Sequence, residues 1–287
     1  MQSLHKNTMM TPKRIVFRTY VRMLEAMTMM QPPKRTCHLS LNPITEKEAV
    51  DIITVAFNNA HLIPLQEQFL KKNISDQYTH IVADNSTNMQ AREEIYQYCQ
   101  AQGIPYISLP YNWLNKIGGS YSHACALNYV YKHVIQKRKP FAFGQIDHDL
   151  FPVEKLSIID YLRDQPVYGP LRHREECWYL SAIMSFFRYD YVQDKKVDFL
   201  PVTPYKTYLD SGGGNWYDIY SHLPLKEMKF PAERIEPLRE GGDRHGDSLE
   251  WFDNKRWLHT INGSCWKQVA EGKENLVKQL LDKYLEA

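Results

Sequence analysis

Apolar runs and polar breaks alternate through the first half of the chain. Runs rich in β-branched and aromatic residues predict buried strands at 49–59, 78–86, 104–109 and 141–147. Between them, apolar residues at helical spacing predict helices at 61–72, 89–102 and 120–136. Strand and helix therefore alternate, and this alternation predicts an α/β fold with a mostly parallel sheet and helices on both faces.

The alternation weakens after Pro152. The pattern there predicts strands at 166–170 and 178–188, an extended segment at 198–210, and a glycine-rich loop at 211–216 that leads into a short helix. A charged loop at 239–247 and a last strand at 256–261 follow. An amphipathic helix closes the sequence at 266–287, with four aliphatic residues on its apolar side: Val269, Leu276, Leu280 and Leu281.

The first 48 residues are basic, and no acidic residue precedes Glu25. A helix is expected at 14–30, before Pro32-Pro33, with Lys13, Arg14, Arg18 and Arg22 on its polar side. One interpretation is an arm or helix that packs on the main body. The other is an interfacial helix that contacts an anionic membrane from one side.

Composition argues against a nucleic-acid-binding, zinc-binding, disulfide-rich or membrane-spanning protein. Hydrophobic residues make up 43% of 287 residues and the formal net charge is +2, so no global field favours nucleic acid. The five cysteines are scattered and form no C-x-x-C pair, which favours a reducing, cytoplasmic setting over a zinc site or disulfide framework. No apolar run reaches transmembrane length.

Two aspartates end the strand expected at 141–147. Alternate side chains of a strand share a face, so Asp147 and Asp149 point the same way, and two close carboxylates repel unless a cation lies between them. Oxygen ligands suit Mg or Mn. The alternative is a polar strand exit that caps a turn. Asn58 and Asp84 also end strands, and ligands of open parallel sheets bind beyond the carboxyl ends.

These residues together resemble the nucleotide-sugar-binding half of a GT-A (Rossmann-like) glycosyltransferase of the family 2 type. The glycine fingerprints of dinucleotide-binding and P-loop proteins are absent. The matching pieces are Ala56-Phe57-Asn58, Ala83-Asp84-Asn85-Ser86, Ala126-Leu127-Asn128 and Asp147-His148-Asp149. The resemblance implies metal-dependent transfer of a sugar from a UDP- or GDP-sugar to a glycan, lipid or protein acceptor, with no role for nucleic acid.

The resemblance also implies roles for single residues. Asp84 would bind the base, Asp147 the ribose and the metal–diphosphate, and Phe57, Asn58 and Asn128 the rest of the donor. Asp149 and His259 would join Asp147 as metal ligands. Asp210 would be the general base of an inverting transfer, beside glycines that leave room for an acceptor.

Each of these roles has an alternative. Asp84 suits an Asx-turn, His259 a buried core histidine, and Asp210 a cap. Leu127 stands where the family often has arginine, and rival bases remain: Glu175, Glu176, Asp243, Asp247 and Glu250. Gly118-Gly119-Ser120 could bind phosphate at a helix start or form a simple turn, with Lys116 and His123 as weaker candidates nearby.

Composition, periodicity and the resemblance together predict four segments of the chain. These are the basic arm or helix at 1–48, the nucleotide-sugar-binding half at 49–152, a smaller acceptor-side half of the same domain at 153–265, and the C-terminal helix at 266–287. Two other functions stay open. A sugar nucleotidyltransferase shares such a core but usually has a glycine-rich loop after its first strand, and a degenerate GT-A module would bind nucleotide without turnover.

Overall fold

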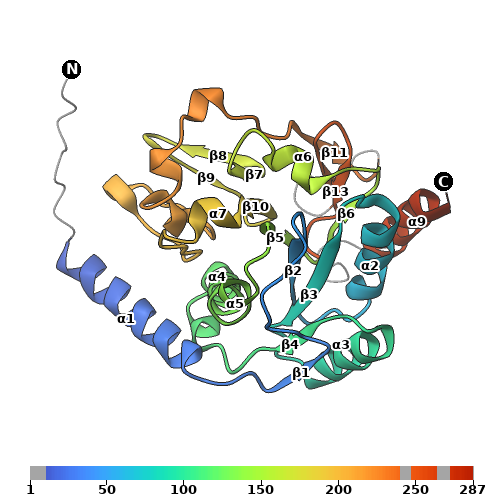
Figure 1. The fold of residues 1–287 in the computed structure, drawn as a ribbon, viewed down its shortest axis with the longest axis horizontal. Coiled ribbons are helices and arrows are strands. Elements are labelled where there is room, and N and C mark those ends of the chain that lie inside the picture. Colours follow the sequence, from blue (N-terminus) through green and yellow to red (C-terminus); the bar gives the residue numbers. More distant parts are fainter. Residues whose placement is uncertain (1–10, 240–246, 264–271, 287) are drawn as a thin grey trace.

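A seven-stranded sheet forms the centre of the molecule (Figure 1). The computed structural model describes residues 11–239, 247–263 and 272–286. The strand order is β1-β4-β3-β2-β5-β10-β7, and the four strands from β4 to β5 run parallel. The expected α/β class with a mostly parallel sheet is confirmed. The strands are β1 (Arg35–Cys37), β2 (Val50–Ala56), β3 (Tyr78–Asp84), β4 (Tyr106–Ser108), β5 (Ala142–Asp147), β7 (Val167–Tyr168) and β10 (Met184–Arg188).

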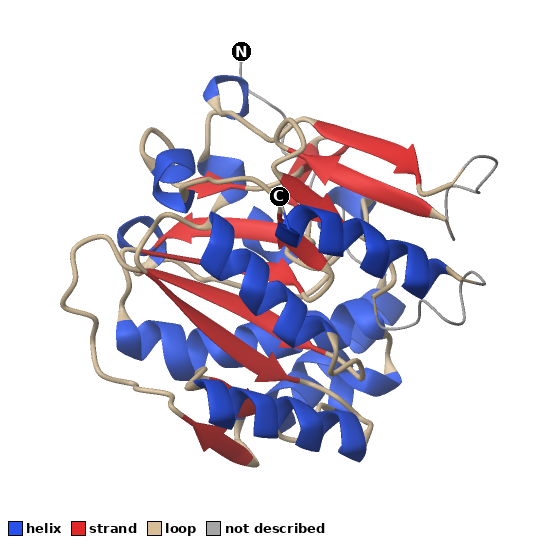
Figure 2. Cartoon of the chain, turned by 90° about the vertical axis from the view of Figure 1, so that its right-hand side faces the viewer, coloured by secondary structure: helices blue, strands red, loops and turns tan. Residues whose placement is uncertain are grey.

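Helices cover both faces of this sheet (Figures 1 and 2). Every residue of β2 is buried, because its alternate side chains enter different cores. Ile53 and Val55 pack with α1 (Pro12–Met29) and α4 (Gly119–Val130), whereas Val50 and Ile52 face α2 (Leu62–Asn73). The remaining large helix, α3 (Met89–Gln102), packs on β3 and β4 and ends at Gly103 in the left-handed conformation, as a C-cap glycine should.

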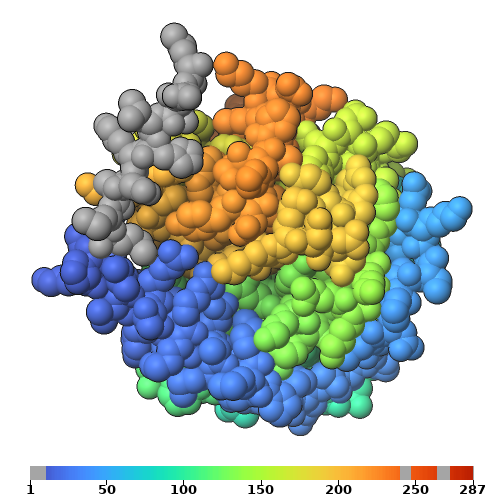
Figure 3. Space-filling view, turned by 60° about the vertical axis from the view of Figure 1, so that its left-hand side comes forward, coloured from blue at the N-terminus to red at the C-terminus, as the bar shows by residue number. Residues whose placement is uncertain are grey.

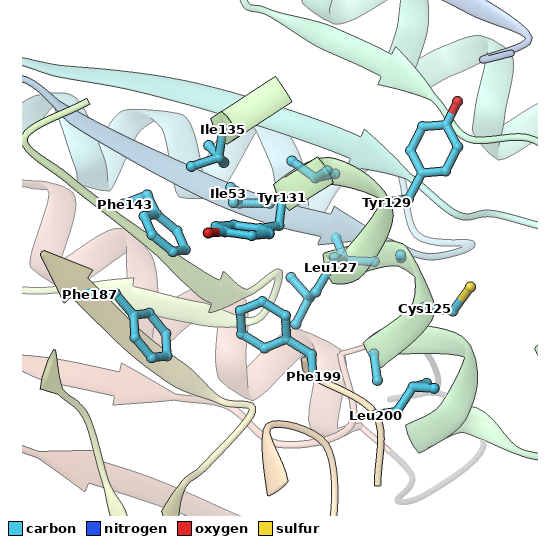
Figure 4. Close-up of a cluster of buried hydrophobic side chains, with 14 of the residues drawn as sticks. Ile53, Cys125, Leu127, Tyr129, Tyr131, Ile135, Phe143, Phe187, Phe199 and Leu200 are labelled. Carbon is cyan, nitrogen blue, oxygen red and sulfur yellow. The ribbon is translucent and has the colours of Figure 1, made fainter. Parts of the chain in front are cut away.

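The first core lies between the sheet and α4 (Figure 4). Phe143 of β5 and Phe187 of β10 stack with ring centroids 5.4 Å apart, and Tyr131 covers Phe143. The helix continues beyond α4 through a π-helical turn, η2 (Tyr131–Ile135), into α5 (Gln136–Arg138). Leu127 is 1% exposed in this core, so the position lies away from any ligand.

The second half of the chain builds two smaller sheets. One has the order β11-β12-β13-β6 with antiparallel pairs, and the other is the β8–β9 hairpin. The single strand expected at 178–188 is wrong, because the chain leaves one sheet after β9 and enters the central sheet as β10. The new strands are β6 (Leu150–Pro152), β8 (Leu171–Arg174), β9 (Cys177–Leu180), β11 (Glu233–Pro237), β12 (Ser248–Phe252) and β13 (Trp257–His259).

Short helices connect these strands. They are α6 (Ile158–Leu162), α7 (Tyr189–Val192), and the 3-10 helices η1 (Trp113–Lys116), η3 (Pro204–Lys206), η4 (Gly213–Trp216), η5 (Tyr220–His222) and η6 (Leu225–Glu227). The expected C-terminal helix is present as α9 (Lys273–Glu286), which buries Val277 and Leu281. Leu276 and Leu280 are half-buried, and Val269 lies outside the described residues.

Helix α1 is attached to the body by its C-terminal half. Val21, Leu24 and Thr28 are buried there, whereas residues 11–20 are all exposed. Arg22 does not lie on the solvent side as expected, because its guanidinium pairs with Asp198 and with Glu25. None of the described helices is both long enough and apolar enough to cross a lipid bilayer.

Candidate metal and nucleotide site

The order of the central strands determines where the site lies. Along the chain β2, β3 and β4 are added in one direction, and β5 is then added on the opposite side of β2. The carboxyl ends of β2 and β5 are therefore a topological switch point, where open α/β sheets bind their ligands. Val55 pairs in register with Asp147 at this point.

The Asp147-His148-Asp149 turn carries the chain from one sheet to another. Asp147 ends β5 in the central sheet, and β6 begins at Leu150 in the four-stranded sheet. Gln66 of α2 donates from Nε2 to the carbonyls of Asp147 (2.7 Å) and Leu150 (2.9 Å), while Asp147 N–H donates to Ile183. These bonds hold both ends of the turn in place.

Strand pairing brings a histidine to the same turn. His259 of β13 lies opposite Leu150 of β6, next to Asp149. Carboxylate oxygens of Asp147 and Asp149 and an imidazole nitrogen of His259 lie within 4.8 Å of one another. The donor set, two carboxylates and one imidazole, fits a divalent ion such as Mn²⁺ or Mg²⁺.

The three side chains of this site have strongly shifted pKa values. Without a cation, protons on Asp147 and His259 reduce the repulsion between the two carboxylates. Loss of hydration and the adjacent Asp149 charge raise the pKa of Asp147 to about 8. Burial opposes ionisation of Asp149, but His259 and the Gly263 N–H hold the pKa of Asp149 well below its usual range. Burial favours neutral His259, yet Asp149 and Glu250 raise the pKa of His259 to about 10. A divalent cation would replace these protons and relieve the repulsion between the carboxylates.

Glu250 orients the imidazole ring of His259. Its Nδ1 lies 2.8 Å from Glu250 Oε2, while its Nε2 lies 3.3 Å from Asp149 Oδ1. Glu250 is itself held by Arg172, which also pairs with Glu233. A carboxylate on the second ring nitrogen fixes the tautomer and orientation that a metal-ligating histidine needs.

Gly263 supports Asp149 through its backbone. Its N–H donates to Asp149 Oδ2 over 2.6 Å. A Cβ at position 263 would lie 2.5 Å from Asp149 Cβ and 2.9 Å from Oδ2, closer than packed atoms allow. Only glycine therefore lets the backbone reach this carboxylate without displacing it.

A cavity of about 540 Å³ opens beside the turn. Asp147 at the end of β5, His148 directly after it, and Phe57 directly after β2 line the cavity. Gly119 and Ser120, the first residues of α4, line another side, so the positive end of that helix is directed at the cavity. This volume is typical of small-molecule and cofactor sites.

His123 of α4 also faces this cavity. Its Nε2 lies 3.7 Å from Asp147 Oδ1 and has no hydrogen-bond partner among the described residues. Burial, with His148 nearby, lowers the pKa of His123 to about 4, so the ring is neutral at pH 7. A neutral imidazole nitrogen is thus available to a bound molecule.

Asp210 lies in the wall of the same cavity as Asp147. Its Oδ1 accepts hydrogen bonds from Ser211 N–H (2.8 Å) and from the Tyr208 hydroxyl (3.2 Å). The expected open space beside Gly212-Gly213-Gly214 is wrong. A Cβ on Gly213 would meet Leu209 at 2.4 Å and one on Gly214 would meet Asp198 at 2.5 Å, so these glycines allow close packing instead.

Three expected donor-binding residues are occupied elsewhere. Asp84 is fully buried and accepts from Ser86 N–H and the Tyr106 hydroxyl, which is the Asx-turn alternative, and it does not line the cavity. Asn128 does not line the cavity, and its side chain binds Glu25 (2.6 Å) and Phe199 N–H (2.8 Å). Neither residue lines the cavity, and their expected roles toward a donor stay predictions.

Asn58 has a structural role as well. Its Oδ1 accepts from the N–H groups of Thr87 and Asn88, each over 2.9 Å, and so joins the end of β2 to the loop before α3. Its φ is 56°, a left-handed conformation that asparagine tolerates. The side chain expected to bind the donor is thus used within the loop, and its role toward a donor stays a prediction.

A group of polar residues beside Asp84 was not anticipated from the sequence. Asn85 and Ser122 both line the cavity and are joined by a 2.9 Å hydrogen bond. Asn112 holds both residues in place, because its side-chain amide donates to Asn85 Oδ1 and to Ser122 O. The one signal in the sequence is that Asn85 directly follows Asp84 at the strand end.

The rival general bases are placed away from the cavity wall. Glu250 is buried against His259, and Asp247 pairs with Arg239. Glu175 accepts from the Thr207 hydroxyl, and its neighbour Glu176 is exposed. Asp243 lies outside the described residues. Among the candidate bases that the structure describes, Asp210 is thus the carboxylate that lines the cavity.

Comparison with known proteins adds little to this geometry. No family model matches the sequence, and no curated protein matches it. A solved structure of WbbM, a bifunctional glycosyltransferase, aligns with 52% of this chain and 33% of that chain, at 11% sequence identity and a TM-score of 0.35. This chain therefore aligns with about a third of that protein, and a likeness this weak supports no conclusion about fold or function.

Proposed function

We propose that this protein is a metal-dependent glycosyltransferase that moves a sugar from a nucleoside-diphosphate donor to an acceptor hydroxyl. The observation that carries the proposal is the grouping of Asp147, Asp149 and His259 at a topological switch point, beside a cavity that also contains Asp210. The sequence resemblance to GT-A enzymes supports the same assignment. The weak likeness to WbbM is not needed for it.

The donor diphosphate would lie between the three metal ligands and the start of α4. A divalent ion held there would supply a Lewis acid that stabilises the charge of the departing diphosphate. Gly119 and Ser120 would favour the same negative charge through the helix dipole. His123 and Asn85 would position the donor by hydrogen bonds from the cavity wall.

Asp210 is our choice for the general base. The bond from the sugar C1 to the diphosphate oxygen breaks, and its electron pair leaves with the diphosphate. The acceptor oxygen forms a bond to C1 on the opposite face, and its proton passes to Asp210. One direct displacement of this kind inverts the anomeric centre.

A panel of nucleotide sugars tests the proposal without knowledge of the acceptor. We expect slow hydrolysis of one UDP- or GDP-sugar with Mn²⁺ or Mg²⁺, measured as released nucleoside diphosphate, and none after chelation by EDTA. Release of pyrophosphate from a nucleoside triphosphate plus sugar phosphate would instead identify a nucleotidyltransferase. Nucleotide binding without turnover under every metal condition would identify a binding module.

A further inference from the structure

Four polar side chains are buried between α2 and the central sheet, and we call them the buried network. They are Thr54 of β2, Gln66 and Glu67 of α2, and His80 of β3, and none is more than 5% exposed. They lie beneath the outer layer of the molecule, one face of which is shown in Figure 3 with α1 in blue and later segments in green, gold and orange. None of the four lines the cavity, so a ligand bound in the cavity does not account for them.

Gln66 fixes the direction of the hydrogen bonds in the buried network. Its Nε2 donates to the carbonyls of Asp147 and Leu150, so both hydrogens of the amide are used. Its Oε1 lies 2.7 Å from Thr54 Oγ1. An amide oxygen has no hydrogen to give, so the Thr54 hydroxyl must donate to it. The opposite orientation of the amide would place Oε1 against two carbonyl oxygens, which repel it.

The hydroxyl of Thr54 extends this direction to His80. Thr54 Oγ1 lies 3.0 Å from His80 Nε2, and because its one hydrogen is given to Gln66, it accepts from Nε2. His80 Nδ1 lies 2.6 Å from Glu67 Oε2. Burial opposes ionisation of Glu67, but His80 and Lys71 lower the pKa of the Glu67 carboxyl, so Glu67 accepts from Nδ1.

The buried network therefore ends at the backbone of the metal-binding turn. His80 donates to Thr54, Thr54 donates to Gln66, and Gln66 donates to the two carbonyls that flank the turn. Buried hydrogen bonds in such a series polarise and strengthen one another. Because one amide group spans the backbone from Asp147 to Leu150, it limits the directions in which the aspartate side chains of the turn can point.

We propose that Thr54, His80 and Glu67 are positioning residues of the candidate metal site. The inference rests on the proposed function, because it assigns a cation to the turn. Through Gln66, the three residues hold the turn so that the two carboxylates keep the spacing that a divalent ion needs. Loss of such supporting hydrogen bonds commonly weakens metal binding roughly 10- to 100-fold.

The direction of the hydrogen bonds can be tested in the wild-type protein without metal. In protein with isotope-labelled histidine, NMR should show a hydrogen on His80 Nε2 that exchanges slowly with water, because it is buried in a hydrogen bond to Thr54. A His80 Nε2 without a hydrogen would require Thr54 to donate to His80 instead of Gln66, and would overturn the inference.

Two replacements of Thr54 test its hydroxyl. Valine has the shape of threonine without the hydroxyl, whereas serine keeps the hydroxyl. We expect Thr54→Val to weaken Mn²⁺ binding roughly 10- to 100-fold, measured by calorimetry with UDP or GDP present, and Thr54→Ser to stay within about threefold of the wild type. If Thr54→Ser binds as weakly as Thr54→Val, the hydroxyl is not responsible and the inference is wrong.

Thr79→Val is the matched control. The Thr79 hydroxyl accepts from Arg138 over 3.1 Å, so this variant also loses a hydrogen bond within the sheet, but one that does not lead to the turn. It should bind Mn²⁺ like the wild type. Equal weakening by Thr54→Val and Thr79→Val would show a general effect of lost stability and would also overturn the inference.

Gln66→Met tests whether Thr54 acts through Gln66. Methionine keeps the length of glutamine but cannot donate to the turn, so Mn²⁺ binding should weaken at least as much as in Thr54→Val. The double variant T54V/Q66M should bind no more weakly than Gln66→Met alone, because the connection to the turn is already broken. Effects that multiply in the double variant would show that Thr54 acts by another route, against the inference.

Amide exchange at the turn separates this inference from the proposed function. The Asp147 N–H donates to Ile183, and in metal-free protein it should exchange faster in Thr54→Val than in Thr54→Ser or Thr79→Val. Faster exchange without any Mn²⁺ binding by the wild type would reject the metal site and the proposed function alone. Mn²⁺ binding that Thr54→Val leaves unchanged would reject the positioning role alone. Unchanged exchange without Mn²⁺ binding would reject both.

Discussion

Replacing Asp149 with asparagine is expected to abolish the thermal stabilisation that Mn²⁺ and nucleoside diphosphate give together. In the wild type, both ligands at about a hundred times their dissociation constants should add roughly 2.7 kcal/mol through mass action. This corresponds to a rise in melting temperature of roughly 5–10 °C for a domain of this size. Asp149→Asn removes a carboxylate ligand, so the rise should disappear. Differential scanning fluorimetry with and without the ligands measures it.

The matched control is Asp51→Asn. Asp51 is also fully buried and forms a two-point ion pair with Arg138, with N–O distances of 2.7 and 2.9 Å. It lies four residues before Val55 on β2, roughly 13 Å from the carboxyl end. Asp51→Asn should lose roughly 3–5 kcal/mol of stability because it leaves the buried Arg138 without its carboxylate, whereas Asp149→Asn should lose less because His259 keeps Glu250 as a partner. Asp51→Asn should nevertheless keep the full ligand response, and an Asp149→Asn protein that also kept it would contradict the metal site.

Asp210→Asn is expected to lower the rate of sugar transfer roughly 100- to 10,000-fold while leaving donor and metal binding within about twofold. Asparagine keeps the shape of the side chain and can still accept from Ser211 N–H, but it cannot take a proton from the acceptor. Single-turnover transfer from the donor identified in the panel measures the rate, and calorimetry measures donor affinity.

Asp218→Asn is the control for this variant. Asp218 is exposed and lies on the same segment, eight residues further along the chain, so its replacement should change neither rate nor affinity. A transfer rate that survived in Asp210→Asn would remove Asp210 from the mechanism. Loss of donor affinity to the same extent as loss of rate would show that Asp210 holds the donor and is not a base.

The central elements could be predicted because their sequence patterns are local. The β-branched run in β2 predicts a strand, and the pattern of Met89–Gln102 followed by Gly103 predicts a helix. The alternation of such strands and helices predicts the parallel sheet. The β11–β12 hairpin was missed because β11 is nearly all exposed and lacks the alternation of apolar and polar residues that predicts a half-buried strand. The division of 178–188 into β9 and β10 depends on which sheet each strand joins, which a continuous apolar run does not reveal.

The contacts of the candidate site could likewise be predicted where they are local and not where they join distant parts of the chain. Asp147 and Asp149 are two residues apart on one strand end, so their proximity follows from the sequence, whereas His259 reaches them through pairing of β13 with β6. The partners of Asn128, Glu25 and the Phe199 N–H, could not be predicted because they are distant in sequence. The Asx-turn of Asp84 was a stated alternative because it is local, whereas the Tyr106 hydroxyl that also binds Asp84 comes from another strand. The supporting carboxylate of Glu250 could be identified only once β12 and β13 were seen to pair.

In the proposed metal site, Asp147, Asp149 and His259 hold a divalent cation that binds a nucleoside diphosphate. Anomalous diffraction from a crystal grown with Mn²⁺ and UDP or GDP tests it directly. We expect one strong manganese peak about 2.2 Å from an oxygen of each aspartate and from His259 Nε2, with the diphosphate on the cavity side of the ion. A crystal that contains nucleotide in the cavity but no manganese at these three side chains would contradict it.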